Sequence, residues 1–238
     1  FYYSIDLLNS RVLLLPLCET RIGMNKKREL KNQIYNEISG IVKALSNPNR
    51  LEIIDFIANG QKSVEDIALQ TGNSIANASQ HLQVLRKERL VTTSKKGNHV
   101  FYGLASMEVY MVWKNLRDLS ISVSPFVEQT LTKLRSEFLY DPPIPFDEIQ
   151  KRNDVYLLDV RPLDEYERRH IPKAISIPLD ELEDRISEIP KDKLIIAYCR
   201  GKFCLVADEA VKLLHSKGFN AKKIEEGVFD YRIKPELK

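Results

Sequence analysis

The sequence predicts two domains of different class: a mainly α-helical domain that carries a β-hairpin, and an α/β domain with a parallel sheet. Three observations give this prediction. Apolar residues recur at helical spacing through the first half, three prolines fall within residues 140–145, and short apolar runs alternate with helical segments beyond them. A length of 238 residues suits two domains of about 100–150 residues each. We therefore expect domains at residues 24–139 and 146–238, joined by a Pro-rich linker at 140–145.

The composition, 43% hydrophobic and 29% charged, is that of a globular protein and excludes collagen-like and low-complexity chains. Three cysteines, Cys18, Cys199 and Cys204, are too few for a disulfide framework, so we expect a reducing, cytoplasmic environment. No apolar run approaches the roughly 20 residues of a membrane-spanning helix, so no membrane association is expected. Basic residues are in excess over residues 1–140 but not beyond, which favours a polyanion-binding module in the first half.

Residues 1–23 have two interpretations. Residue 1 is Phe, and Met24 opens a polar, charged stretch, so the segment could lie upstream of the natural start. Alternatively, it is a short apolar segment that docks on the body of the protein. It lacks the basic start and the cleavage site of a secretory signal, and we assign it no function.

The first half contains a predicted helix-turn-helix. A helix begins at Asn47-Pro48, because Asn caps helices well and Pro suits the first turn. Ser63 caps a short helix over residues 64–70, residues 71–73 break it, and a second helix follows over residues 74–86. Two short helices joined by a tight Gly-containing turn form this unit.

A β-hairpin follows the second helix. Residues 90–94 and 99–104 alternate as strands do, and Lys95-Lys96-Gly97-Asn98 has the composition of a turn. A hairpin in this place is a wing. Beyond it, residues 107–139 form a long helical region, bent near Pro125, with an apolar stripe that favours dimerisation.

The second helix and the wing carry the groups that a DNA-binding surface needs. We expect Ala78, Leu82 and Leu85 to face the core, which leaves short polar side chains for base edges. Asn and Gln can pair with adenine, whereas the lysines would contact phosphates without reading the sequence. The residues expected to face DNA are Ser74, Ala76, Asn77, Ser79, Gln80, His81, Lys87, Lys95, Lys96 and Asn98. Of these, we expect His81 to pack or to face a phosphate rather than to bind a metal.

Three motifs in this frame resemble the ArsR-type winged-helix repressors: ALSNPNRL at 44–51, ASQHLQVL at 78–85 and KGNHVFY at 96–102. The resemblance covers about residues 36–118. It implies a homodimeric regulator that binds double-stranded DNA. Many such proteins sense metals through a cysteine pair on the helix before the recognition helix. Residues 64–70 contain no cysteine, so we expect no metal site there.

In the second half, strand-like runs at 155–160, 174–177, 194–198 and 221–224 alternate with helical segments at 163–168, 179–186 and 205–217. Active sites of parallel sheets lie at the carboxyl ends of the strands. The segment Cys199-Arg200-Gly201-Lys202-Phe203-Cys204 follows the third of these strands and precedes a helix.

Cys199 therefore has the sequence context of a reactive thiol. Backbone N–H groups of a tight loop and a helix N-terminus both favour an anion, and Arg200 and Lys202 add positive charge. We expect a lowered thiol pKa and a thiolate at neutral pH. The same loop could hold a persulfide on Cys199 or an oxyanion of a substrate.

The loop, together with LLDVR at 157–161 and HIPKAISIP at 170–178, resembles the rhodanese domain over about residues 146–234. The resemblance implies that Cys199 is the sulfur-accepting nucleophile and that Arg200 to Cys204 form the anion-binding loop. It also implies that Asp159 and Arg161 support that loop. Lys202 stands where Gly is usual and Cys204 where Arg is frequent, which argues against efficient turnover of thiosulfate. Cys204 has two interpretations: a thiol that resolves a modified Cys199, or a small core residue that begins a helix.

Together these patterns indicate a homodimeric, DNA-binding regulator, a repressor, whose rhodanese-like domain accepts or senses sulfane sulfur from a small donor through Cys199. Two alternatives stay open: a sulfurtransferase, or less plausibly another thiol enzyme for oxyanions, tethered to DNA, and an inert rhodanese fold that serves as an interaction module. No cofactor and no metal ion are expected.

Overall fold

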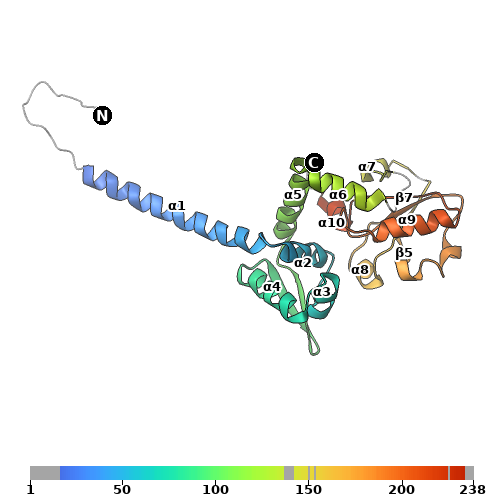
Figure 1. Cartoon of the computed structure of the whole chain (residues 1–238), viewed down its shortest axis with the longest axis horizontal. Coiled ribbons are helices and arrows are strands. Elements are labelled where there is room, and N and C mark those ends of the chain that lie inside the picture. Colours follow the sequence, from blue (N-terminus) through green and yellow to red (C-terminus); the bar gives the residue numbers. More distant parts are fainter. Residues whose placement is uncertain (1–16, 137–141, 150, 153, 225, 234–238) are drawn as a thin grey trace, which may run out of the picture. The chain divides into compact units, whose positions relative to one another are not determined.

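The computed structural model describes residues 17–136, 142–149, 151–152, 154–224 and 226–233. The chain forms two compact units that divide between Ser46 and Asn47 (Figure 1). The first unit is a single helix, α1 (Leu17–Leu45). This helix begins before Met24 and therefore includes part of the segment that we had set apart as an extension. Residues 1–16 lie outside the described part of the chain.

One face of α1 carries exposed apolar side chains. Ile34, Ile38, Ile41 and Val42 follow one another at spacings of one to four residues, and each is exposed. The helical period that we predicted for this segment is present. However, α1 does not bury this stripe within its own unit, because a single helix has nothing to pack against.

The second unit opens with the predicted helix-turn-helix. Its elements are α2 (Pro48–Ala58), β1 (Lys62–Ser63), α3 (Val64–Gln70) and α4 (Ile75–Lys87). Each predicted cap is present. The Asn47 side chain accepts from the N–H of Arg50, and Ser63 forms a reciprocal capping box with Asp66. Such caps satisfy N–H groups that the first turn of a helix leaves without intrahelical partners.

The wing is the hairpin of β2 (Val91–Lys96) and β3 (His99–Leu104). With β1 it forms a three-stranded antiparallel sheet in the order β1-β3-β2. Lys95 and Lys96, which we expected in the turn, belong to β2, and only Gly97 and Asn98 connect the strands. A two-residue turn of this kind favours positive φ, and Gly97 has φ +60°.

Two helices complete the helical part: α5 (Met107–Val123) and α6 (Pro125–Ser136). Where we expected one bent helical region, the helix ends at Ser124 and a new one begins at Pro125. Proline lacks the N–H that would continue the helix, but it is well tolerated in a first turn. Among the described residues, no helix is both long and apolar enough to cross a bilayer.

The α/β part has a four-stranded parallel sheet in the order β5-β4-β6-β7. Its elements are α7 (Phe146–Ile149), β4 (Val155–Asp159), α8 (Leu163–Arg168), β5 (Ile175–Ser176), β6 (Leu194–Tyr198), α9 (Val206–Ser216), β7 (Ala221–Lys223) and α10 (Val228–Ile233). The helix predicted over 179–186 is instead two short 3₁₀ turns, η1 (Leu179–Glu181) and η2 (Ile186–Glu188).

The structure differs from the predicted linker at 140–145 near the end of that segment. Ile144 is buried and pairs with Ile224 in a parallel bridge, and its N–H donates to the carbonyl oxygen of Lys223. Prolines on both sides favour extended backbone, which can continue the edge of the sheet. Tyr140 and Asp141 lie outside the described residues.

Strand β6 separates two apolar cores. Ile195, Ala197 and the following Cys199 belong to one core, which α9 covers, whereas Ile196 and Tyr198 belong to the other. This alternation is the two-residue period of a strand that is buried on both faces. It determines that the Cys199 side chain enters the α9 side of the sheet.

Candidate functional site

The loop between β6 and α9 brings two thiols together. Cys199 directly follows the strand, and Cys204 lies two residues before the first residue of α9. Gly201 has φ +134°, a conformation that side-chain-bearing residues rarely adopt, and the N–H of Cys204 donates to its carbonyl oxygen at 3.0 Å. The Cys199 thiol donates to the carbonyl oxygen of Cys204 at 3.5 Å. Both thiols are free.

The two thiols differ in exposure. Cys199 is 3% exposed and is part of the apolar core beneath α9. Cys204 is half-buried and lines a cavity of about 620 Å³. A reagent in this cavity would therefore meet Cys204 first.

The pKa values of the two thiols differ from our expectation that Cys199 carries the thiolate. Burial, with the interaction with Cys204, raises the pKa of the Cys199 thiol well above its usual value, although the N–H groups of Gly201 and Ala207 oppose this. The hydrogen bond from Cys199 lowers the pKa of Cys204 to about 6, helped by Arg200 and by the N–H of Val206, and opposed by burial. The thiolate that we expected at position 199 is therefore placed at position 204. The reason is that the strand period directs the first thiol into the core.

This difference predicts a pH dependence of alkylation. Because the thiolate is the reactive form and the pKa of Cys204 is about 6, its alkylation by iodoacetamide should rise through pH 6 and be near its plateau at pH 7. Cys199 should stay unmodified over this range. Peptide mapping by mass spectrometry between pH 5 and pH 9 measures both residues. A midpoint near about 8.5, the value of an unperturbed thiol, would contradict this assignment.

We expected Arg200 and Lys202 to add unpaired positive charge beside the thiols. Both side chains are instead paired with carboxylates. The guanidinium of Arg200 donates to both oxygens of Glu165 at 2.7–3.1 Å, and it lies over the ring of Phe56 in α2. The ammonium of Lys202 lies 3.3 Å from Asp118 in α5. A charge that is already paired contributes less to the stabilisation of a nearby thiolate. The loop therefore directs its cations toward the helical part of the unit.

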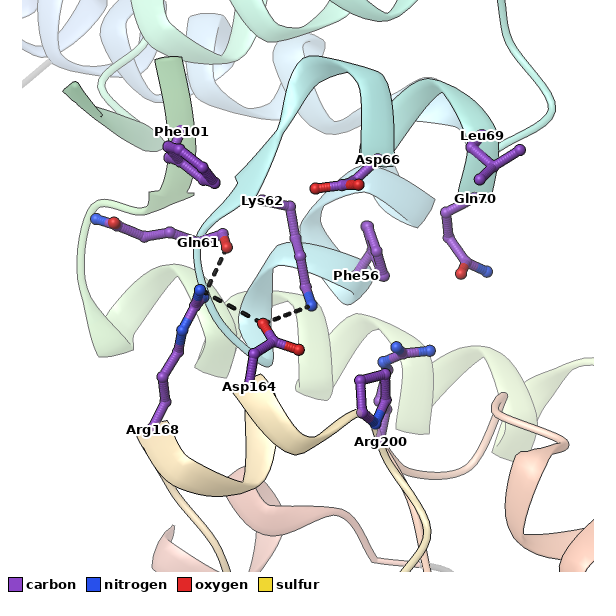
Figure 2. Close-up of a pocket in the computed structure, with 11 residues that line it drawn as sticks. Phe56, Gln61, Lys62, Asp66, Leu69, Gln70, Phe101, Asp164, Arg168 and Arg200 are labelled. Atoms are coloured by element: carbon purple, nitrogen blue, oxygen red, sulfur yellow. Dashed lines mark hydrogen bonds and ion pairs between the residues drawn. The ribbon is translucent and has the colours of Figure 1, made fainter. Parts of the chain in front are cut away.

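Glu165 joins the two parts of the second unit. Its carboxylate is fully buried and also accepts from the ammonium of Lys62, in β1, at 2.6 Å. Burial alone would raise the pKa of Glu165, but hydrogen bonds and charges from Arg200 and Lys62 hold it below its usual value. Figure 2 shows the neighbouring contacts, in which Asp164 lies between Lys62 and Arg168.

Phe203 and the backbone of Lys202 extend the contact with the helical part. The Phe203 ring packs edge-on against Trp113 of α5 at 6.1 Å between centroids. Arg135 of α6 donates to the carbonyl oxygen of Lys202 at 2.6 Å. Residues 200, 202 and 203 of the loop thus contact α2, α5 and α6.

Asp159 ends β4 beside the end of β6, and Arg161 follows it by two residues. Arg161 donates through Nε and Nη2 to the Asp159 carboxylate at 2.7–3.3 Å, and both side chains are buried. Tyr198, directly before Cys199, pairs with Asp159 in the sheet. The buried ion pair therefore lies beside the strand end from which the loop departs.

The residues expected to face DNA gather on α4 and the wing. Ala78, Leu82 and Leu85 are fully buried, as predicted, and the opposite face of α4 is open. The exposed residues of the set are Ser74, Ala76, Gln80, Lys87, Lys95, Lys96 and Asn98, while Asn77, Ser79 and His81 are half-buried.

Four members of this set have partners within the protein. The Ser74 hydroxyl accepts from the N–H of Asn77 at 3.2 Å and caps α4. Asn77 donates to the side-chain oxygen of Asn73 at 2.6 Å, and the Lys96 ammonium lies over the ring of Phe101. His81 lies 3.2 Å from the side-chain amide of Asn49. Partial burial, and to a lesser extent the positive charge of Arg50, lowers the pKa of His81. No cluster of three or more metal-binding side chains occurs within the described residues.

Lys62 and Glu165 are the residues that sequence reasoning missed. They lie 103 positions apart, and each stands among ordinary surface-like residues in the sequence. Their contact exists only because the two parts of the unit pack together. No local pattern distinguishes such a pair from two solvated charges.

Family models match both parts of the chain. Residues 47–93 match the bacterial regulatory protein, arsR family, and residues 145–234 match the rhodanese-like domain. The chain is 32% identical over 221 residues to the HTH-type transcriptional regulator Rv0324 of Mycobacterium tuberculosis, covering 88% of this chain and 93% of that protein.

Other relatives match a smaller share of the chain. The arsenical resistance operon repressor of Staphylococcus xylosus is 40% identical over 70 residues, which are 29% of this chain and 67% of that protein. Among solved structures, the homodimeric winged helix-turn-helix DNA-binding domain of Mb0332 from Mycobacterium bovis is 29% identical. It covers 40% of this chain and 89% of that domain, with a TM-score of 0.39.

Proposed function

Because the chain belongs to the ArsR family of transcriptional regulators and carries a rhodanese-like domain, we propose that it is a DNA-binding repressor that responds to sulfane sulfur at Cys199 and Cys204. The observation that carries this proposal is a pair of free thiols on a loop that also contacts α2 and α5. A lone reactive thiol could serve catalysis equally well. A second thiol within hydrogen-bonding reach allows a stable oxidised state, which a sensor needs.

The recognition surface in this proposal is the exposed face of α4 with the wing. Gln80 is exposed on α4, and a side-chain amide there can pair with adenine in the major groove. Lys87, Lys95 and Lys96 are exposed and would neutralise phosphates. The helix has the length and the apolar inner face that insertion into the groove requires.

Two substitutions separate these roles. Gln80→Ala should change sequence preference by about 1–3 kcal/mol at one base pair, because it removes a base contact. Lys96→Ala should weaken all DNA sequences alike and reduce the salt dependence by about one counterion. Fluorescence anisotropy with two operator variants at several salt concentrations measures both effects. Lys193→Ala, an exposed lysine of the α/β part, is the control for net charge, and equal behaviour of Gln80→Ala and Lys96→Ala would contradict the proposed surface.

The proposed repressor acts as a homodimer. On α5 the side chains of Val112, Leu116, Leu119 and Val123 are 41–66% exposed and recur at spacings of three and four residues. A continuous apolar stripe of this kind favours packing against the same helix of a second chain. Two chains would match two DNA half-sites about one helical turn apart. Sedimentation equilibrium should give twice the mass of one chain.

The link between the thiol pair and DNA is the packing of the loop against the helical part. A disulfide or persulfide at residues 199 and 204 would require the loop to rearrange, and Arg200, Lys202 and Phe203 would move with it. Those residues contact α2, α5 and α6. Helix α2 packs against α4, and α5 carries the proposed dimer face. A signal alters DNA affinity only if the two loop states favour different arrangements of these helices.

Treatment with the uncharged donor bis(2-hydroxyethyl) trisulfide tests the proposed function. DNA affinity of the wild type should fall at least several-fold, and dithiothreitol should restore it. The double variant Cys199→Ala, Cys204→Ser should bind DNA like the reduced wild type and should not respond. An equal response in the double variant, or no change in the wild type, would refute sulfur sensing at this loop. A thiosulfate–cyanide turnover assay on the same samples separates sensing from sulfurtransferase activity.

A further inference from the structure

A cavity of about 620 Å³ lies between the helical part and the rhodanese-like part of the second unit. Its wall is mostly apolar and comes from both parts: Leu51, Phe56, Trp113, Phe203, Leu205 and Val206. Cys204 also lines it, whereas Cys199 lies behind Cys204 in the core. A pocket of this volume is large enough for a small organic molecule.

The charges around the cavity are mainly negative. Glu52, Asp55 and Glu209 line it, and Glu52 and Glu209 are exposed at its rim. Burial and the charge of Asp55 raise the pKa of Glu52, as expected where carboxylates lie close together. Among the described residues that line the cavity, the one cation is Arg200, which is already paired with both oxygens of Glu165. A dianion such as thiosulfate would meet repulsion here, whereas an uncharged apolar molecule would not.

From this geometry we infer that the cavity binds an uncharged organic polysulfide and that Cys204, rather than Cys199, makes the first bond to it. This inference rests on the proposed function and names its ligand class and its order of reaction. It reverses the roles that the rhodanese resemblance implied for the two thiols. The reason is geometric: Cys204 lines the cavity, whereas Cys199 is 3% exposed and enclosed beneath α9.

The chemistry balances with the trisulfide R–S–S–S–R as the donor. The Cys204 thiolate attacks a terminal sulfur, which forms Cys204–S–S–R and releases the persulfide R–S–S⁻. The Cys199 sulfur then attacks the Cys204 sulfur, forms the Cys199–Cys204 disulfide and releases R–S⁻, which takes the Cys199 proton. Two thiols lose two electrons, and the trisulfide gains them as one thiol and one persulfide. The Cys199 thiol donates to the carbonyl oxygen of Cys204 at 3.5 Å, which keeps the second thiol next to Cys204 for this step.

The order of reaction is tested with bis(2-hydroxyethyl) trisulfide, which is uncharged. The wild type should form the internal disulfide, and Cys199→Ala should accumulate a mixed adduct on Cys204. Cys204→Ser should leave Cys199 unmodified over the same time. Peptide mapping of the wild type at partial conversion gives the same information without a variant, because the first adduct should be on Cys204. A first adduct on Cys199, in the wild type or in Cys204→Ser, would overturn the order of reaction.

The ligand class is tested by comparing that probe with bis(2-carboxyethyl) trisulfide, which has the same trisulfide core but two negative charges. The wild type should react faster with the uncharged probe. Glu52→Lys should raise the ratio of the rate with the dianionic probe to the rate with the uncharged probe about fivefold. Glu65→Lys makes the same charge change on an exposed acid of α3 outside the cavity lining and should leave this ratio unchanged. Equal rates for both probes in the wild type would overturn the preference for an uncharged ligand.

These outcomes are distinguishable from failure of the proposed function. If the uncharged trisulfide weakens DNA binding but Cys199 reacts first or the dianionic probe is preferred, the sensor stands and this inference fails. If neither thiol reacts with any of the probes and DNA affinity does not change, both fail.

Discussion

Replacing Glu165 by alanine is expected to lower the free energy of unfolding by about 3–5 kcal/mol. Glu165 is fully buried, and its carboxylate pairs with two cations, Lys62 and Arg200, whose side chains are 9% and 17% exposed. Without Glu165, Arg200 stays largely buried and loses its carboxylate partner, while Lys62 keeps only the exposed carboxylate of Asp164 at 3.7 Å, so most of their desolvation is uncompensated. Urea unfolding followed by circular dichroism measures the change.

The matched control is Glu181→Ala. Glu181 also pairs with an arginine, Arg185, at 2.9 Å, but its side chain is 48% exposed. Exposed pairs of this kind contribute about 1 kcal/mol or less, so the control should unfold nearly like the wild type. A Glu165→Ala variant that also stays within about 1 kcal/mol of the wild type would show that the buried cations find other partners or water.

Gly227→Ala is expected to displace the thiol-bearing loop. A Cβ atom at position 227 would lie 2.1 Å from the carbonyl oxygen of Arg200 and 3.1 Å from the backbone nitrogen of Gly201. Both contacts are with backbone, so the loop itself must shift, at a cost of about 1–3 kcal/mol or more. The N–H groups near Cys204 would shift with it, and the alkylation midpoint of Cys204 should rise above pH 6.

Gly103→Ala provides the comparison. There a Cβ would approach the Cγ atom of Gln61 at 3.0 Å, which belongs to a flexible side chain that can turn away. That variant should leave the alkylation profile of Cys204 unchanged. If Gly227→Ala also leaves the profile unchanged, the position of the loop does not control the thiolate.

The helix-turn-helix could be predicted from the sequence because its signals are local. Asn47, Ser63 and Ser74 cap their helices through side chains that reach only two or three residues along the chain. The apolar spacing of Ala78, Leu82 and Leu85 determines which face of α4 is buried, and all three are fully buried. The alternation of strands and helices beyond residue 146 predicted the parallel sheet in the same way.

The state of the thiols could not be predicted in this way. The sequence determined by itself that a cysteine follows a buried strand and that a second cysteine precedes the next helix. Tertiary structure decided which of them is enclosed in the core, which lines a cavity, and which carries the lowered pKa. Tertiary structure also brought Lys62, Glu165 and Arg200 into contact. The physical reason is that caps and periodicity act between neighbours in the chain, whereas burial and ion pairing depend on segments about a hundred residues apart that meet only in the folded protein.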